Sequence, residues 1–357
     1  ASDDTLNSSV IEWSADCNGD GIVDYGQILD GTYADNDGNG VPDDCDPISP
    51  YQTIDNPDPG SNIIFADAVA VDGDHAVATA RGFDGLIYFY KRTNGVWSVV
   101  DTAVLPVDTL GLPESQYAGR MGIALVNDVA IVGAGFGGAG EGQARIYRRS
   151  GETWSLEQTI DSTGPSGQHG ATFAENLDYD GTTLVISAYQ EKIDGIADAG
   201  ATYFYQFDGS QWAEVSRVVS TDIVAYGFFG VSVAVHGNFA AVASNDNGNN
   251  RGIVETLKWD GDDWTIVETL LPPDGVADDD FGQSVALVGN RLLINQSLAT
   301  VYGIDDAGCV WLYQLNADGT ANEPERIISP TPHMNEAFGR VIDLSDDGIF
   351  IGGGRPV

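Results

Sequence analysis

Short runs of alternating apolar and polar residues recur along most of this chain, separated by turns rich in Gly, Asp and Asn. In one such unit, residues 68–71 and 76–80 flank the polar turn Asp72-Gly73-Asp74, which is the signature of a β-hairpin. The content of 45 Gly and only 2 Met disfavours a helical bundle and favours short strands joined by tight turns. The pattern therefore predicts an all-β protein.

The hairpin is part of a larger unit that repeats at intervals of 52 to 57 residues. A third strand rich in aromatic and β-branched residues follows each hairpin, and then a turn and a last strand. Four strands per unit is the composition of a β-propeller blade. The six units begin at Phe65, Gly119, Phe173, Phe229, Phe281 and Phe338, and a Trp that we expect to lie between neighbouring blades opens the last strand at Trp97, Trp154, Trp212 and Trp264.

The sixth unit contains only its two inner strands before Val357. Residues 51–55 repeat the outer-strand sequence of residues 158–161, and residues 9–13 are similar to the third strand at 253–257. Since an incomplete blade leaves unpaired edges, these segments predict a six-bladed ring closed by strands from both termini. The alternative is part of a seven-bladed propeller. The predicted organisation is residues 1–14 as a strand of the closing blade, 15–50 as an inserted loop and 51–357 as the propeller.

The inserted loop contains two stretches with the spacing of an EF-hand calcium loop, in which oxygens come from positions 1, 3, 5, 7, 9 and 12 and Gly occupies position 6. Gln27 replaces the acid at position 12 of the first stretch, and Pro42 argues against an ordinary helical EF-hand. Calcium would supply folding free energy to a loop with few apolar residues. The alternative is a solvated acidic loop. The candidate ligands are Asp16, Asn18, Asp20, Ile22, Asp24 and Gln27 in the first stretch, and Asp35, Asp37, Asn39, Val41, Asp43 and Asp46 in the second.

The chain has three cysteines, and two of them lie in these calcium stretches. A disulfide between Cys17 and Cys45 would join the two stretches and would imply an oxidising compartment. Cys309 lies in a predicted third strand, and we expect it to be a free, small, buried hydrophobic residue.

The repeated openings, Phe-Gly or similar, lead into a strand, a short turn and a second strand that ends in small residues such as IVGA or IGGG. They resemble the FG-GAP repeats of the integrin α-chain propeller and of many secreted bacterial proteins. The resemblance covers the chain from about Phe65 and implies an extracellular propeller. The acidic stretches resemble the calcium repeats of thrombospondin type 3. Integrin blades hold calcium in DxDxDG loops, whereas the equivalent turns here, such as VDGDH and LVGNR, are shorter.

The formal charge of −39 excludes sequence-independent binding to nucleic acid or to an anionic membrane, because both require a positive face. No apolar run is long enough to span a bilayer, so we expect no membrane insertion. The first residues, ASDDTLNSS, contain neither an initiator Met nor a signal region. They are typical of a mature secreted protein or of a trimmed chain.

Candidate catalytic residues are few. His75, His169, His236 and His333 lie in different units, and no HExxH motif occurs. The stretch GFGGAGEG lacks the Lys and helix of a phosphate loop, and Asp278–280 and Asp305–306 are interpreted as solvated acidic faces.

The sequence therefore favours a secreted or cell-surface calcium-binding propeller without catalytic residues. Its function would be adhesion, binding of an extracellular protein or glycan, or self-assembly into an extracellular structure. The alternatives are a polysaccharide lyase and a glycan-binding lectin, in which Tyr189 and Tyr302 could stack on sugar rings.

Overall fold

The computed structural model describes residues 54–58, 64–81, 86–104, 118–134, 142–162, 172–244, 252–274, 279–345 and 348–353. The chain divides into two compact units, Ala1–Pro57 and Asp58–Val357. The predicted calcium ligands, Cys17, Cys45 and the predicted strand at 9–13 lie outside the described residues. Ile54 and Asp55, the described end of the predicted strand at 51–55, are not in a strand.

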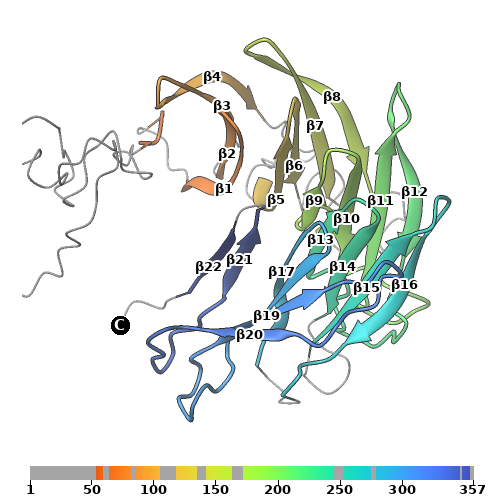
Figure 1. Ribbon diagram of the computed structural model, residues 1–357. Coiled ribbons are helices and arrows are strands. Elements are labelled where there is room, and N and C mark those ends of the chain that lie inside the picture. Colours follow the sequence, from red (N-terminus) through yellow and green to blue (C-terminus); the bar gives the residue numbers. More distant parts are fainter. Residues whose placement is uncertain are drawn as a thin grey trace, which may run out of the picture. The chain divides into compact units, whose positions relative to one another are not determined.

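The second unit contains 22 strands and, over its described residues, no α-helix. These strands form five four-stranded sheets and one two-stranded sheet (Figure 1). We number the sheets as blades 1 to 6. The strands are β1 (Ile64–Asp72), β2 (His75–Arg81), β3 (Leu86–Thr93) and β4 (Val96–Val104) in blade 1; β5 (Ala118–Val126), β6 (Val129–Ala134), β7 (Gln143–Ser150) and β8 (Thr153–Asp161) in blade 2; β9 (Leu177–Tyr179), β10 (Thr183–Ala188), β11 (Ala201–Phe207) and β12 (Trp212–Val218) in blade 3; β13 (Ser232–His236), β14 (Phe239–Ser244), β15 (Ile253–Trp259) and β16 (Trp264–Leu270) in blade 4; β17 (Phe281–Val288), β18 (Arg291–Gln296), β19 (Cys309–Gln314) and β20 (Glu325–Ile328) in blade 5; and β21 (Val341–Leu344) and β22 (Ile349–Gly352) in blade 6.

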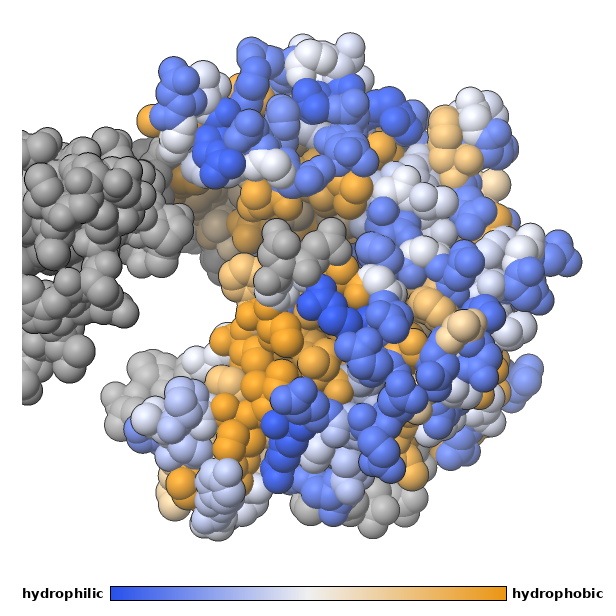
Figure 2. Space-filling model, viewed as in Figure 1, coloured by the Kyte–Doolittle hydropathy of each residue, from blue (hydrophilic) through white to orange (hydrophobic). Residues whose placement is uncertain are grey.

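Every blade is an antiparallel meander in which each strand pairs with the next strand in the sequence. The innermost strands β5, β9, β13, β17 and β21 contact one another in chain order, as in a β-propeller. Figure 2 shows apolar surface gathered near the centre of this unit, in the region of β17, β21 and β22, with hydrophilic surface on the outer strands. The prediction of an all-β propeller with five complete units and a two-stranded sixth is confirmed.

The hydrophobic core is divided among the interfaces between successive blades. One buried cluster joins each pair from blades 1 and 2 to blades 5 and 6. The predicted position of the outer-strand Trp is confirmed at two interfaces: Trp154 stacks on Phe89 of blade 1 at 4.7 Å, and Trp264 stacks on Phe204 of blade 3 at 4.6 Å. Stacked aromatic rings add attraction beyond the area that they bury.

Side chains of the outer strands also join the blades, through a contact that we call the latch. In blades 1 to 4, the residue four positions after the outer-strand Trp accepts a hydrogen bond from the backbone N–H of the equivalent residue in the next blade, which is the outer-strand Trp in blades 2 to 4 and Ala321 in blade 5. Asp101 accepts from Trp154 at 2.7 Å, and Glu268 accepts from Ala321 at 2.7 Å. Gln158 and Ser216 accept from Trp212 and Trp264 at 2.8 and 3.4 Å. The repeat therefore places one polar acceptor at each of the four interfaces between the complete blades.

Cys309 is a free, fully buried thiol in β19, as predicted. Burial raises the pKa of this thiol to about 11, which keeps it protonated at neutral pH. Its role is therefore that of a small apolar side chain.

Candidate binding face

Two long connections between second and third strands form ordered loops at the same end of their blades. Residues 189–200 join β10 to β11, and residues 297–308 join β18 to β19. Each contains an isolated β-bridge, Ile193 with Ile196 in one and Val301 with Ile304 in the other. A backbone hydrogen bond closes each base, from the N–H of Gly200 to Glu191 and from the N–H of Gly308 to Ala299.

The segment that enters the next blade braces each loop. Backbone N–H groups of Tyr226 and Phe228 donate to Ala197 and Asp198 at 3.0 and 2.9 Å. In the equivalent place, Asn335 and Ala337 donate to Asp305 and Asp306 at 3.2 and 3.0 Å. We call residues 189–200 with 223–229 the first loop pair, and residues 297–308 with 333–338 the second loop pair.

Both loop pairs contain non-glycine residues with left-handed backbone, a conformation that costs about 1–2 kcal/mol per residue. The equivalent sites match between the two pairs, which shows that the conformation belongs to the repeat. Such strain persists only where surrounding contacts fix the backbone, and it is typical of functional sites. The residues are Asp194, Asp198, Tyr226 and Phe228 in the first pair, and Tyr302, Asp306, Asn335 and Ala337 in the second.

Three large apolar or aromatic side chains on these loop pairs face solvent. Tyr302 is 84% exposed, Met334 64% and Tyr226 58%. Exposed large apolar side chains on rigid, conformationally fixed loops are typical of protein interaction sites. Tyr302 was expected as an exposed aromatic and is confirmed as such, whereas no pattern in the sequence distinguished Tyr226 or Met334.

Tyr189 could be an exposed aromatic residue or could pack beneath its own loop, and the structure shows the second arrangement. Its hydroxyl donates to Glu175 at 2.5 Å, and its ring lies 6.1 Å from that of Phe228. The stacking role considered for Tyr189 is therefore not supported, because its ring and hydroxyl are both engaged within the protein.

A buried carboxylate anchors the first loop pair from below. Glu191 is 1% exposed, accepts a hydrogen bond from the Tyr203 hydroxyl at 2.6 Å and forms an ion pair with Arg217. Burial and the carboxylate of Glu191 raise the pKa of Tyr203, so this hydroxyl remains a donor. Breaking such a buried pair from one side is costly, since the other charge is left without compensation. Sequence reasoning missed Glu191 because its partners come from later strands.

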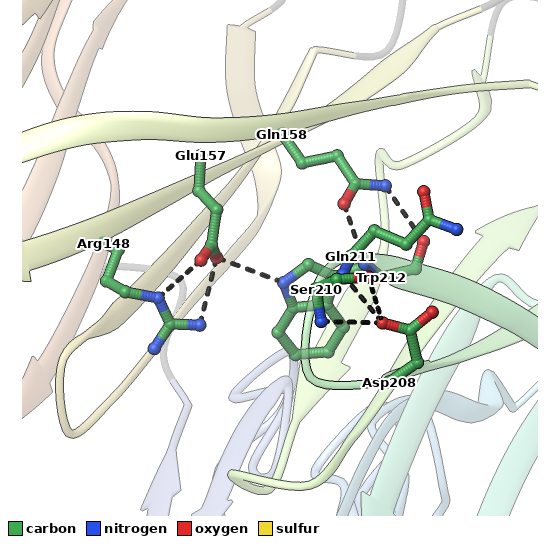
Figure 3. Close-up of polar contacts among 7 residues, drawn as sticks. All are labelled: Arg148, Glu157, Gln158, Asp208, Ser210, Gln211 and Trp212. Carbon is green, nitrogen blue, oxygen red and sulfur yellow. Dashed lines mark hydrogen bonds and ion pairs between the residues drawn. The ribbon is translucent and has the colours of Figure 1, made fainter.

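A pocket of about 280 Å³ lies between blades 2 and 3 and is lined by three aromatic residues, Tyr179, Phe207 and Trp212, together with Arg148. Figure 3 shows how Glu157 organises its polar edge: it pairs with both nitrogens of the Arg148 fork, at 2.6 and 3.0 Å, and accepts from the Trp212 indole at 3.4 Å. The Arg148 guanidinium lies 5.3 Å from the centre of the Phe207 ring. Aromatic walls with a few oriented polar groups are typical of small-ligand pockets.

A second cavity, of about 360 Å³, lies among the inner strands β5, β9, β13, β17 and β21. Asp178 lines it and accepts backbone N–H bonds from Val235 and Tyr179, both at 2.8 Å. The pKa of Asp178 is raised to about 6, chiefly by burial; the charges of Asp180 and Asp343 act in the same direction, and the two N–H donors act in the opposite one. Asp180 accepts from Gly237 at 2.6 Å, so these carboxylates join neighbouring blades.

The acidic and basic residues considered as catalytic candidates are not brought together in the described residues. His236 lines the inner cavity, and exposed His333 contacts Glu336 at 3.6 Å, while His169 lies outside the description. Asp279 and Asp280 accept from Gln296 and Ser297, and Asp278 is not described. Across the described chain, no group of three or more His, Cys, Asp or Glu is arranged to hold a metal ion.

Comparison with known proteins is consistent with this geometry. The FG-GAP repeat family matches residues 264–313, which run from the outer strand of blade 4 to the third strand of blade 5. No curated protein matches the sequence significantly.

Two of the solved structures that resemble the chain illustrate the likeness. A protein from Lactobacillus plantarum has a TM-score of 0.50 at 16% identity, over 78% of this chain and 74% of its own. A protein from Bacteroides uniformis with a provisional assignment as a 6-phosphogluconolactonase has a TM-score of 0.50 at 12% identity, over 81% and 77%. At these identities the likeness extends to the fold alone. No helix among the described residues is long and apolar enough to cross a bilayer.

Proposed function

We propose that this protein is an extracellular binding module, and that its partner, an extracellular protein, docks on the two loop pairs. The observation that carries this proposal is the exposure of Tyr302, Met334 and Tyr226 on braced, left-handed loops. Loops positioned by a rigid scaffold commonly carry binding function, and aromatic side chains and Met are enriched at interfaces.

The loop pairs also present acidic groups beside these side chains. Asp194, Asp198, Asp305 and Asp306 lie in the same loops and give the face a negative character. A partner with a basic rim around an apolar centre would complement it and would be steered towards it by charge. In adhesion or assembly, the exposed aromatic side chains of this face would supply most of the affinity, because interface affinity concentrates in a few buried aromatic contacts.

The test is a binding screen of extracellular matrix proteins and glycans with and without calcium, followed by affinity measurements on any protein ligand found. The variant Tyr226→Ser, Tyr302→Ser, Met334→Ser should weaken binding at least tenfold, or by about 1.4 kcal/mol. The control is Val96→Ser, which removes an exposed apolar side chain from the β3–β4 turn at the opposite end of a blade. Equal binding by the triple variant and the unaltered protein would refute docking on this face.

A second candidate function, glycan recognition, is favoured by the pocket between blades 2 and 3. Its aromatic walls and the Arg148–Glu157 pair could receive a sugar ring and its hydroxyls. If the ligand of the screen is a glycan, Phe207→Ala should abolish its binding while the triple loop variant retains it. The lyase alternative has no comparable support: neither of the two pockets described above is lined by His333, and His169 lies outside the described residues.

We also propose that calcium binds residues 15–50 through the two acidic stretches, and that Cys17 and Cys45 are bonded. The support is the spacing of the candidate ligands in the sequence and the position of one cysteine in each stretch. Chelation should make the 15–50 segment more sensitive to protease while the blades remain folded, because their cores are apolar. Equal proteolysis rates of this segment with and without EDTA would contradict calcium binding.

A further inference from the structure

Blade 1 has an exposed apolar face on its inner strand, on the side away from blade 2. Val71 and Val69 of β1 lie on this face and are 61% and 58% exposed. At the position of Val71, counted back from the hairpin turn, the residues of blades 2 to 6 are only 2–7% exposed and pack towards the preceding blade. They are Leu125, Tyr179, Val235, Leu287 and Leu344. Among the described residues, blade 1 therefore lacks the preceding blade that covers this position elsewhere.

Blade 6 has an exposed apolar face of the complementary kind, on the side away from blade 5. Phe350 of β22 is 65% exposed and is paired with Asp343 of β21. The residues at its position in blades 1 to 5 are all 0% exposed and lie in the cluster that joins each blade to the following one. They are Val77, Ile131, Val185, Ala241 and Leu293. Figure 2 shows the apolar surface in the region of β21 and β22, which is where a following blade would pack.

The carboxylate of Asp343 occupies the position of Asp178 and makes half of its contacts. Asp178 accepts from the next N–H of its own strand and from the N–H of Val235 on the following blade, both at 2.8 Å. Asp343 accepts from the N–H of Leu344 at the same distance, and within the described part of the chain no N–H of another blade bonds to its second oxygen. The residue of blade 1 at the position of Val235 is Val71.

The inner cavity limits what can lie beside β21. Strands β5, β9, β13, β17 and β21 all line this cavity of about 360 Å³, and they contact one another in chain order. The strand β1 contacts β5, at the start of this row. An additional blade would have to insert a second inner strand between β1 and β21. A small cavity bordered by both β5 and β21 favours one strand in this interval rather than two.

We propose that the exposed face of blade 6 packs directly on the exposed face of blade 1 and closes a six-bladed ring. Phe350 then covers Val71 and Val69, and the second carboxylate oxygen of Asp343 accepts the backbone N–H of Val71. Each apolar face is the partner of the other, because their equivalents share one buried cluster at all five described interfaces. Removing both faces from water is favourable in proportion to the apolar area buried.

Paired cysteines in the full chain test this contact. Ser232 accepts the N–H of Val285 across the interface of blades 4 and 5 at 3.0 Å, and the equivalent residues are Val341 and Val69. Val69→Cys with Val341→Cys should therefore form a disulfide within the monomer, as the reference pair Ser232→Cys with Val285→Cys should. The control, Val96→Cys with Val341→Cys, should remain reduced, because Val96 begins the outer strand of blade 1.

Peptide mapping of the monomer fraction identifies each bond. The proposal is overturned if the reference pair bonds and the pair at 69 and 341 does not, which is the result expected when a further blade or another segment covers these faces. It is also overturned if the bond between 69 and 341 forms only between two chains, as expected when a second copy covers them, or if the control pair bonds equally well.

A double-mutant cycle gives a readout that needs no disulfide and decides the question if neither the reference pair nor the pair at 69 and 341 bonds. Phe350→Ser and Val71→Ser should each lower Tm by a few degrees. The double variant should lose less than the sum of the two, because the side chains contact each other. Phe350→Ser with Val96→Ser is the control and should be additive. Additive losses for Phe350→Ser and Val71→Ser, or a Tm that neither change lowers, would contradict the packing. None of these measurements depends on binding a partner, so failure here leaves the proposed function standing.

Discussion

A glycine immediately before the third strand is a recurrent contact point between successive blades. A Cβ on Gly200 would lie 2.2 Å from the carbonyl oxygen of Phe229, and the backbone φ at this glycine is +87°. Gly252 and Gly308 make the same approach to Phe281 and Phe338. The Phe that opens each of these blades therefore seats its backbone against a glycine of the preceding blade, while at Phe229 and Phe281 the ring is fully buried.

Replacing this glycine should cost more than its backbone conformation alone. Gly195 has a nearly identical φ of +89° in the same loop, and no atom lies within 4 Å of an added Cβ. We expect Gly195→Ala to lower the unfolding free energy by about 1–2 kcal/mol. Gly200→Ala should lose a further 1–3 kcal/mol or so because of the clash with Phe229. Urea denaturation of both variants measures the difference, and equal losses would show that the contact yields without cost.

At the scale of the element, the outer strand is the least buried strand of a blade and depends on its latch. The Glu268 carboxylate accepts the N–H of Ala321, which precedes the short strand β20. Together with the hydrogen bond from the Thr256 hydroxyl to Gly319 at 2.9 Å, this contact fixes the β19–β20 connection on blade 4. A polar side chain at this position therefore contributes to blade order as well as to solubility.

We expect Glu268→Ala to destabilise the protein by about 1–3 kcal/mol, since it leaves a partly buried backbone N–H without an acceptor. Glu268→Gln keeps an acceptor oxygen and should recover most of the loss. Thermal unfolding followed by circular dichroism gives the comparison. If Gln and Ala at this position are equally destabilising, the charge rather than the hydrogen bond stabilises the strand.

At the scale of the whole molecule, the net charge of −39 acts against compactness. Only Lys91, Lys192 and Lys258 are lysines, so acidic groups outnumber their potential partners over most of the surface. Repulsion among like charges destabilises a compact state, and dissolved salt screens it. The stability of the propeller should therefore depend on ionic strength.

Raising NaCl from about 10 mM to about 1 M shortens the Debye length from about 30 Å to about 3 Å, and Tm should rise as repulsion is screened. Sorbitol at equal osmolality controls for effects of solute exclusion. The measurement is made with excess calcium so that the proposed calcium sites would stay saturated. A Tm that is constant or falls across this range would show that surface repulsion does not limit stability.

The sequence by itself determined the strands, the four-strand unit and the order of the blades. These features follow from alternation, turn residues and repeat length, which act through near neighbours in the chain. It also predicted the free, buried Cys309, because this residue lies in a predicted third strand, and the Trp contacts between blades, because the Trp recurs at a fixed place in the unit. The Phe-Gly openings were visible for the same reason.

Only the tertiary structure decided which residues form the proposed binding face. Tyr302 and Tyr189 are both aromatic residues in equivalent loops, yet Tyr302 is exposed, whereas Phe228 and Glu175 engage Tyr189. Glu191 became an anchor only when Arg217 and Tyr203 from later strands met it. Exposure and burial of a side chain depend on which distant segments pack against it, and a periodic pattern contains no information about those individual contacts.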